Sequence, residues 1–514
     1  MRLTTKRLWL GGLLACGLVG TGCETTSRRR NPERKPVPFP ANLPHSGLAH
    51  AGTGSDPRST VLQAQAVVSA DPSSGGNSQP NVDLAYALEL ARVGNPTVNL
   101  AREAVREAEA GVLAANALKL PSLNAGFNFN LHRGGLQRPQ GTIDEINKQG
   151  LDVGFGTGAV GGGTTVIPGV RLFYPLADVI SAPRISGQQL ATRRSDAIAV
   201  EYVTLLDVAT AYIELHLASV VLEELKRSEA EFAEIVRLTA EFAKAGQGRA
   251  ADTNRAAANA EMVRRQSEDA FGSRAAAAAR LAAVLSLDPA TQLILPPGPL
   301  APLQLIDANA TTESLVARAE AYRPEVAARA SEVMEARWRE RREVIRPWLP
   351  TLAAGYSIGG FGGGGTLTPP EFGRFGARSD FDVAAVWSVQ NLGVGNRTRV
   401  NRNRAVVSQS MAAFDATRNR VREEVLNSHA QIVAAGSQIE TARRRLVVAE
   451  DGYRAERKRI QQGEGLPLEL LDSTRSLLET RLELARAIAA YNVAQFQLLA
   501  AVGTSPASAP LPAK

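Results

Sequence analysis

The sequence has little cysteine, histidine, methionine or aromatic side chain among its 514 residues. Both cysteines, Cys16 and Cys23, lie at the N-terminus, so the remaining chain has no thiol for a disulfide, a zinc site or nucleophilic catalysis. The five histidines are isolated, with no second histidine or carboxylate at the spacing of metal ligands. We therefore expect no disulfide framework, no metal site and no cofactor.

Sequence signatures of enzymes are also missing. The chain has neither a phosphate-binding loop that ends in Gly-Lys-Ser/Thr nor a serine nucleophile elbow. Residues 156–161 have the glycine spacing of a dinucleotide fingerprint, but no helical pattern follows them, so they indicate a flexible loop. We predict that the protein is not an enzyme.

The N-terminus has the pattern of an export signal. Three cations precede residues 8–19, which are uncharged, apolar and too short to span a bilayer. Cys16 and Cys23 each follow a segment that resembles the processing box of bacterial lipoproteins. We favour acylation of Cys23, because cutting before Cys16 leaves a shorter apolar run. Acylation of Cys16, and ordinary cleavage without a lipid, remain the alternatives.

The positive charge is concentrated near this leader. Lysine and arginine (58) exceed aspartate and glutamate (51) by 7, and residues 36–514 carry only one of these excess charges. The body of the chain is therefore almost neutral. With its scattered aromatic residues it lacks the basic surface and stacking platforms of a nucleic-acid-binding protein.

Two parts of the body follow the same order. Residues 94–98 open a helical pattern that closes at a Leu-Pro-Ser-Leu segment, and residues 322–326 open one that closes at Leu-Pro-Thr-Leu. Glycine pairs at residues 245–248 and 462–465 are 217 positions apart, and each precedes a further helical run. Prolines interrupt the chain between the two parts. We predict six regions: a signal peptide (1–22), a Pro/Ser/Gly-rich tether (23–80), a first repeat (81–287), a linker (288–310), a second repeat (311–502) and a disordered tail (503–514).

Four segments alternate between apolar and polar residues, as β-strands do: residues 122–132, 166–176, 352–358 and 381–389. A strand of about ten residues can cross a bilayer at a tilt, but the same pattern suits half-buried strands of a soluble sheet. Pro168 is unfavourable in a closed barrel, because a proline cannot donate a backbone hydrogen bond and a barrel has no free edge.

Very long helices are predicted beside these strands. No proline occurs from residue 398 to residue 462, and apolar residues recur there every seven positions: Val425, Ile432, Ile439, Leu446, Tyr453 and Ile460. A similar seam runs through residues 221–242. After the second glycine turn Leu471, Leu478 and Ala485 keep the same spacing. Each long helix is therefore expected to fold back against its successor as an antiparallel hairpin.

The sequence resembles the TolC-like outer-membrane efflux proteins, in particular their lipoprotein branch. The features that carry the resemblance are the doubled order, the Arg323-Pro324-Glu325 helix start, the Leu-Pro-Ser/Thr-Leu segments before the first strands, and the glycine turns. The resemblance covers about residues 81–502. It implies an α+β membrane protein that forms a homotrimer. Each chain would give four transmembrane strands to a 12-stranded barrel and long coiled-coil hairpins to an α-helical barrel across the periplasm. It also implies a periplasmic adaptor protein and an inner-membrane pump as partners.

The resemblance further implies contact residues. The hairpin tips of the family meet the adaptor, and the matching positions are Ala245, Gly246, Gly248, Arg249, Gly463, Gly465 and Leu466. Family members can carry an acidic ring at the periplasmic constriction, which matches Glu469 and Asp472. The equivalents in the first repeat, Asp252 and Arg255, break this pattern. A solvated helix face explains the acidic pair equally well.

We therefore expect a passive channel in the outer membrane of a Gram-negative bacterium, anchored by lipid and extending into the periplasm. A lipid-anchored periplasmic coiled-coil adaptor or scaffold is the alternative. A scaffold needs no pairs of lipid-length alternating strands, and a channel needs two such pairs.

Overall fold

The computed structural model describes residues 82–510, apart from residues 121, 124, 156–157, 160–165, 168–169, 289–290, 292, 297, 365–373 and 463. The chain divides into units Met1–Ser55 and Asp56–Lys514, and all described residues belong to the second. The structure does not describe the predicted signal peptide or the predicted tether, which contain Cys16 and Cys23.

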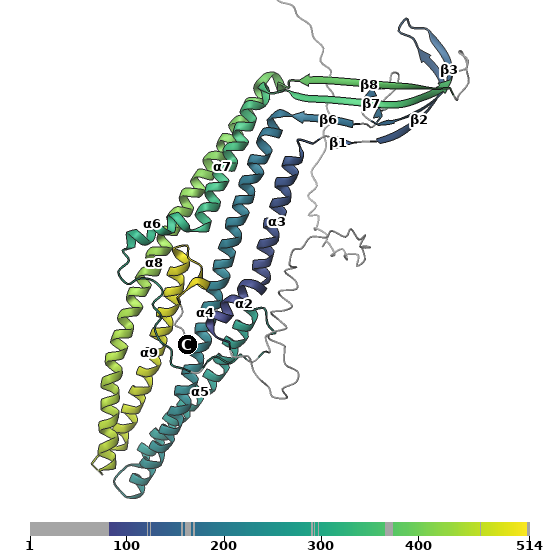
Figure 1. The fold of residues 1–514 in the computed structure, drawn as a ribbon. Helices are drawn as coiled ribbons and strands as arrows, with labels where there is room; N and C mark the ends of the chain where they lie inside the picture. The colour runs from purple at the N-terminus through teal and green to yellow at the C-terminus, as the bar shows by residue number, and fades with distance from the viewer. Residues whose placement is uncertain are drawn as a thin grey trace, which may run out of the picture. The chain divides into compact units, whose positions relative to one another are not determined.

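The helices and strands of the described chain occur in two sets with the same order (Figure 1). The first set contains α2 (Leu84–Gly94), α3 (Pro96–Ala117), strands β1 to β6, α4 (Leu176–Lys244) and α5 (Ala250–Val284). The second contains α6 (Thr312–Tyr322), α7 (Pro324–Ile345), strands β7 and β8, α8 (Val394–Gln461) and α9 (Pro467–Ala501). Three short 3-10 helices accompany them: η1 (Arg346–Trp348), η2 (Gln390–Gly393) and η3 (Pro506–Ser508).

Local sequence explains the break between the first two helices of each set. Asn95 ends α2 and caps α3, because its side-chain oxygen accepts a hydrogen bond from the backbone N–H of Thr97 at 2.8 Å. Pro96 and Pro324 occupy the first positions of α3 and α7, where a missing N–H costs nothing. The predicted helix starts are confirmed here, whereas α2 and α6 were not expected.

The long helices are also confirmed. α4 has 69 residues and α8 has 68, and α5 and α9 return with 35 residues each. α8 begins four residues before the predicted start. Seam residues such as Phe232, Val425, Ile439 and Leu478 are buried, so the seven-residue pattern marks the faces along which the helices pack.

Two buried clusters join the two sets of helices. One contains Leu205, Val208 and Leu215 of α4 together with Phe496 of α9. Among the described residues one helix, α4, has a segment apolar and long enough to cross a membrane. Because 44% of that segment is buried against its neighbours, helix packing accounts for its composition.

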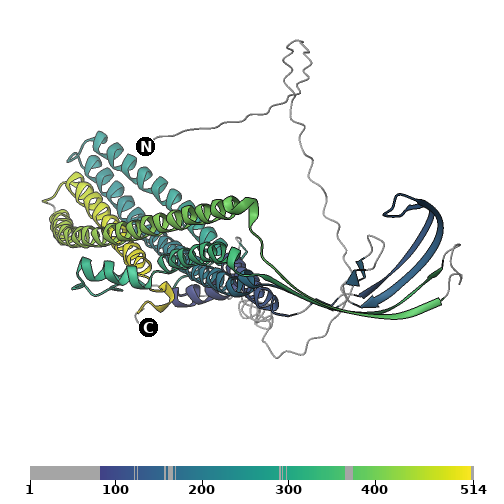
Figure 2. The same ribbon diagram turned by 90° about the horizontal axis from the view of Figure 1, so that it is seen from above.

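Six of the described strands form one sheet that is four rows wide. This sheet extends away from the helices (Figure 2). β1 (Ser122–Leu123) and β2 (Ala125–Gln137) share the first row, and β3 (Ile143–Phe155) and β6 (Val170–Pro175) share the second. The third row is β7 (Thr351–Gly364) and the fourth is β8 (Arg374–Val386). All pairings are antiparallel. In the described part of the chain the outer edges of the first and fourth rows have no partner strand.

The strand predictions were partly wrong. β3 was not among the predicted strands, because its sequence mixes charged, glycine and apolar residues without clean alternation. The segment predicted at residues 166–176 forms β5 (Val166–Ile167) and β6, while Leu176 starts α4 and Pro168 lies outside the described residues. β5 pairs with β4 (Gly158–Ala159), so part of the glycine-rich segment 156–161 is a short strand rather than a loop. The last strand ends at Val386, before Trp387 and Val389.

The linker between the two sets is fixed by two buried amides of α9. The side chain of Asn492 accepts a hydrogen bond from the N–H of Leu303 at 2.7 Å and donates one to the carbonyl of Ala301 at 2.9 Å. Gln495 accepts from the N–H of Leu305 at 3.1 Å. Residues 301–305 of the linker are therefore held along α9 by these side chains.

We expect Asn492→Ala to destabilise the fold by about 1–3 kcal/mol, because it removes the two hydrogen bonds that this buried side chain makes to the backbone of Ala301 and Leu303. Thermal or urea unfolding of the purified chain measures this change. Asn427→Ala, at an exposed position of α8, is the matched control and should change stability by no more than a few tenths of a kcal/mol. Equal effects of the two substitutions would contradict this role of Asn492.

The pKa of Asp196 on α4 is raised mainly by burial, against the attraction of Arg193. Glu332 and Glu325 of α7 raise it further, and Arg329 lowers it. The pKa of Asp196 is therefore higher in the folded chain than in the unfolded chain, so the ionised carboxylate lowers the stability of the fold at neutral pH. This loss of stability disappears as the pH falls below the ordinary aspartate range, where the carboxyl group is protonated in both states.

We therefore expect Asp196→Asn to raise the thermal stability at neutral pH and to have no such effect in acid. Unfolding temperatures across a pH series check this prediction. Asp415→Asn, at an exposed site on α8, serves as the control. A stabilisation by Asp196→Asn that is the same at all pH values would contradict the assignment.

Candidate functional site at the ends of the helical hairpins

The first hairpin reverses direction within five residues. Ala245 caps the end of α4, and Gly246 has φ +75°, a left-handed conformation that glycine adopts without strain. The N–H groups of Gln247 and Gly248 donate to the carbonyl of Phe242 at 3.0 and 3.1 Å. Arg249 then caps α5. All four predicted tip residues of this hairpin therefore lie in the reversal.

The second hairpin uses the same plan with different residues. The N–H groups of Glu464 and Gly465 donate to the carbonyl of Arg459 at 3.0 and 3.2 Å. Leu466 caps α9, and Pro467 takes its first position. A Cβ on Gly465 would lie 2.9 Å from the backbone nitrogen of Ile460, so only glycine fits there without displacement. Gly463 lies outside the described residues.

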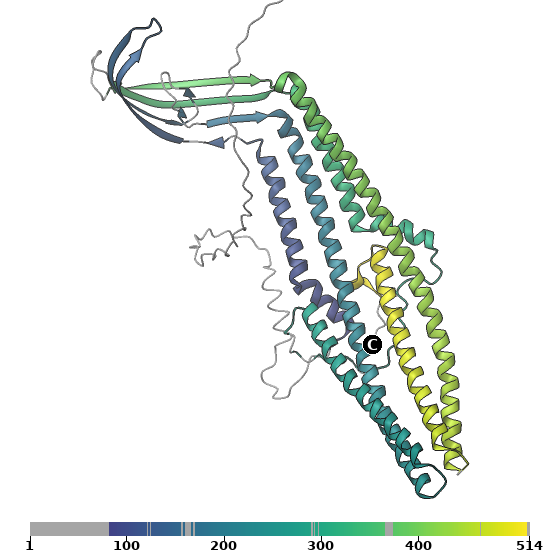
Figure 3. The ribbon, with the colours of Figure 1, turned by 180° about the vertical axis from the view of Figure 1, so that it is seen from behind.

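The two hairpins run next to each other toward these reversals (Figure 3). A buried cluster near the tips combines Phe232 and Ile235 of α4 and Val263 of α5 with Leu471 of α9. Arg481 of α9 forms an ion pair with Glu224 of α4 at 3.5 Å. The structure thus brings the two sets of predicted tip residues to one end of the helical region.

The two residues of the predicted acidic pair, Glu469 and Asp472, have different surroundings. Glu469 accepts a hydrogen bond from Arg459, on the opposite arm of its hairpin, at 3.1 Å. Asp472 is exposed and has no hydrogen bond or ion pair within the described residues. Glu469 also lies in the first turn of α9, where the helix macrodipole favours a negative charge. Its equivalent Asp252 accepts a weak hydrogen bond, at 3.4 Å, from the N–H of Arg249.

Arg459 was missed by the sequence analysis. It is ten residues from Glu469, on the other side of a turn, so helical spacing gives no signal for the pair. Arg459 also contacts Glu456 at 3.1 Å. The arginine therefore bridges Glu456 of its own helix and Glu469 on the other side of the second hairpin tip.

A second exposed cluster lies on α4 before the first tip. Arg237 donates to Glu234 at 2.6 Å and to Glu241 at 2.6 Å. The hydrogen bond from Arg237 is the main reason that the pKa of Glu234 lies below its ordinary value. Because these groups are fully solvated, their contact adds little to stability and mainly fixes the charge pattern near the tip.

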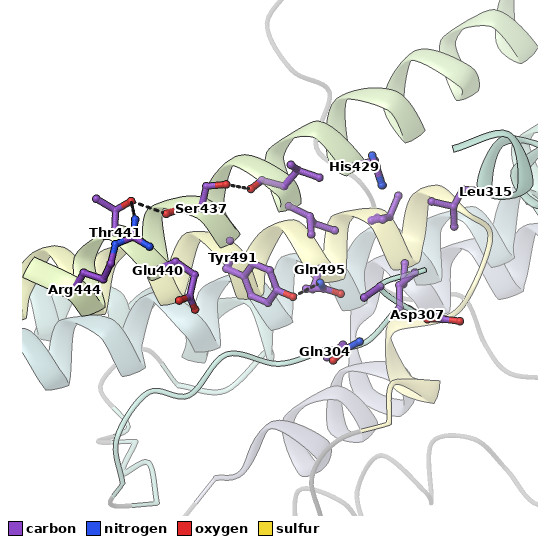
Figure 4. Close-up of a pocket in the computed structure, with 16 residues that line it drawn as sticks. Gln304, Asp307, Leu315, His429, Ser437, Glu440, Thr441, Arg444, Tyr491 and Gln495 are labelled. Atoms are coloured by element: carbon purple, nitrogen blue, oxygen red, sulfur yellow. Dashed lines mark hydrogen bonds between the residues drawn. The ribbon is translucent and has the colours of Figure 1, made fainter. Parts of the chain in front are cut away.

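A groove along the second helical hairpin offers no catalytic arrangement. It has a volume of about 540 Å³ and lies between α8, α9 and the linker (Figure 4). Its polar side chains bond mostly within their own helices, as Ser437 does to the carbonyl of Val433 at 3.1 Å and Gln495 to the hydroxyl of Tyr491 at 2.9 Å. Among the described residues no three His, Cys, Asp or Glu side chains gather as a metal site.

Comparisons with known proteins agree with this geometry. Residues 315–504 match the family model of the outer membrane efflux proteins. The chain is 29% identical over 226 residues to protein CyaE of Bordetella pertussis, and the alignment covers 44% of each chain. The matched part is therefore less than half of that relative's length.

Solved outer-membrane channels share the fold. The VceC protein of Vibrio cholerae has a TM-score of 0.65 at 15% identity, over 82% of this chain and 96% of that one. The MtrE channel of Neisseria gonorrhoeae has a TM-score of 0.65 at 17% identity, over 82% and 89%. OprN, an outer-membrane channel, has a TM-score of 0.67 at 17% identity, over 82% and 90%. Residues 315–504 thus match the outer membrane efflux proteins, and the chain as a whole shares the fold of these solved outer-membrane channels.

Proposed function

We propose that the protein is the outer-membrane channel of a tripartite efflux system. It is a passive duct that carries substrates from an inner-membrane pump and a periplasmic adaptor across the periplasm and the outer membrane. The main observation behind this proposal is a four-row sheet whose strands lead into coiled-coil hairpins built from helices of 35 to 69 residues. Within the described residues, both outer edges of this sheet lack a partner strand. In this role the chain makes and breaks no bond, and the pump supplies the energy.

Trimer formation follows from the edges of the sheet. An edge strand in lipid would leave backbone N–H and C=O groups without partners, which costs several kcal/mol per group. Three copies that pair β2 of one chain with β8 of the next would remove every edge and give a 12-stranded barrel. The repeated order of the elements supports an origin by internal duplication.

The hairpin tips are the proposed contact site for the adaptor. Each chain would present two adjacent reversals to the adaptor. They contain Ala245, Gly246, Gly248 and Arg249 in one hairpin and Gly463, Gly465 and Leu466 in the other. Their exposure supports this role, because the described tip residues are exposed except Gly465. The coiled-coil scaffold remains the competing function, and the sheet disfavours it because a scaffold has no use for strands of lipid length.

Lipid attachment at Cys23 is a further part of the proposal. The acylated cysteine would hold the chain in the outer membrane of a Gram-negative bacterium, and the tether (23–80) would link it to α2. Metabolic labelling with a fatty-acid analogue tests the assignment. Labelling that is lost in Cys23→Ala and kept in Cys16→Ala supports it, and the opposite pattern identifies Cys16.

The acidic pair gives a prediction about ion passage. Three chains would bring six carboxylates from Glu469 and Asp472 around one axis, where they attract cations. We expect Glu469→Ala with Asp472→Ala to weaken block by multivalent cations and to change conductance in planar bilayers. Asp472→Ala alone should retain most of this effect, because the charge of Glu469 is already compensated by Arg459. Unaltered block and conductance in the double variant would exclude the acidic ring.

Conductance also tests the function itself. The purified full chain should form stable, ion-conducting pores in planar bilayers without a nucleotide or another energy source. A protein that remains in solution and never conducts would instead support the scaffold.

A further inference from the structure

The connection between β8 and α8 exposes a group of apolar side chains. Leu392 is 99% exposed, and Trp387, Val389 and Val394 are each more than half exposed. Trp348, 79% exposed, lies at the same end of the sheet, because Thr351 of β7 pairs with Val386 of β8. Large apolar side chains are thus presented where the strands meet the helices.

The backbone of this connection is strained. Asn391, Leu392 and Gly393 have φ values of 50°, 54° and 88°, so three consecutive residues are left-handed. Glycine tolerates this conformation and asparagine adopts it more readily than most residues, but a leucine pays a steric penalty. A fully exposed leucine in such a turn gains nothing from burial within its own chain.

Neighbouring groups hold the turn in place. The side-chain oxygen of Asn396, which is buried, accepts a hydrogen bond from the N–H of Gln390 at 2.8 Å. Gly395 lets the same residue approach, since a Cβ there would be 3.2 Å from the carbonyl oxygen of Gln390. Strain that is fixed by its surroundings usually belongs to a functional site.

Arginine side chains follow this left-handed turn directly in the sequence. The first three turns of α8 contain Arg397, Arg399, Arg402 and Arg404, and no acidic residue occurs between Asp382 and Asp415. Arg404 pairs with Glu340 of α7 at 3.0 Å. In the described part of the chain the other three guanidinium groups are exposed and have no hydrogen bond or ion pair. Cations at a helix N-terminus oppose the macrodipole, so the fold itself gives no reason for them.

We propose that residues 387–402, here called the β8–α8 hook, dock onto the periplasmic leaflet of the outer membrane. Leu392 and Trp387 insert at the level of the acyl chains, and Arg397, Arg399 and Arg402 bind the phosphates of anionic phospholipids. This inference rests on the proposed function, since it assumes that β8 crosses the membrane. Lipid is the partner because the apolar group is continuous with the end of β8 and is followed by cations without counter-charges.

Insertion is tested with the tryptophan of the hook. In the full chain, Trp9, Trp338 and Trp348 are replaced by phenylalanine, and the protein is reconstituted into phosphatidylcholine vesicles that contain phosphatidylglycerol. We expect brominated phosphatidylcholine to quench Trp387 strongly. Quenching should fall in Leu392→Asn, which relieves the strain but removes the apolar side chain. A water-exposed, unquenched Trp387 would overturn the insertion.

Lipid preference is tested separately. Native mass spectrometry of the detergent-solubilised assembly compares phosphatidylglycerol with phosphatidylcholine. Replacing Arg397, Arg399 and Arg402 together by glutamine should reduce the preference for the anionic lipid at least about fivefold, the effect of a single surface arginine. The control replaces Arg443, Arg444 and Arg445 of α8 by glutamine and should keep the preference.

The outcomes separate this inference from the proposed function. A trimer that conducts ions but shows no preference for anionic lipid, or loses it equally in both triple variants, overturns the hook and leaves the channel intact. A chain that neither assembles nor conducts refutes the channel itself.

Discussion

Gly503→Ser is expected to destabilise the folded chain by roughly 2–4 kcal/mol. Gly503 has φ +77°, where any side chain is strained, and it packs against the break between α6 and α7. A Cβ there would lie 2.7 Å from the carbonyl carbon of Tyr322 and 2.9 Å from the backbone nitrogen of Arg323. Backbone atoms cannot move aside as a flexible side chain does, so the end of α9 would be displaced from the break between α6 and α7.

The chain provides a matched control for this prediction. Ser286 lies 217 positions earlier, at the end of α5, and has φ 61°. Its N–H donates to the carbonyl of Ala283 at 3.0 Å, as that of Gly503 does to Ala500 at 3.0 Å. Ser286→Gly should therefore stabilise the chain by about 1 kcal/mol, because it removes the left-handed strain. Unfolding temperatures of both variants measure the effect, and changes of the same sign would contradict the explanation.

Gly465→Ala is expected to abolish export while the protein still reaches the membrane. The added methyl group would lie 2.9 Å from the nitrogen of Ile460 and 3.1 Å from the carbonyl carbon of Arg459. The turn has to open to relieve these clashes, and its hydrogen bonds to the carbonyl of Arg459 then break. We expect this local change to cost about 2 kcal/mol. A displaced tip no longer fits the proposed adaptor.

Gly248→Ala is the control for the first hairpin. Its Cβ would be 3.3 Å from the nitrogen of Ala243, a tight but adjustable contact, so export should be reduced only mildly. Both variants are measured by complementation of drug or metal resistance in a deletion strain, together with their level in the outer membrane. Equal export by Gly465→Ala and the unmodified chain would contradict the importance of the second tip.

The sequence was most informative where one physical pattern repeats over many residues. The seven-residue spacing of residues such as Val425 and Ile439 predicted a long packed helix, because burial of one stripe is the only way to stabilise such a rod. The glycines of the tips were also evident, since reversals of this kind need their conformational freedom.

Features that depend on distant partners could not be predicted. β3 lacks clean alternation, and it becomes a strand only through antiparallel pairing with β2 and β7. The contact of Arg459 with Glu469 crosses a turn, and the hydrogen bond between Asn492 and Leu303 joins segments 189 residues apart. The exposed left-handed turn at Leu392 contradicts local propensity, so no sequence pattern predicted it.

The most direct test of the proposed channel is the mass and location of the native assembly. Membranes from cells that produce the full chain are fractionated, cross-linked and run on gels with and without heating. We predict a trimer in the outer-membrane fraction whose migration changes on heating, as expected for a closed β-barrel. A monomer in the soluble periplasmic fraction would contradict the channel and favour the scaffold.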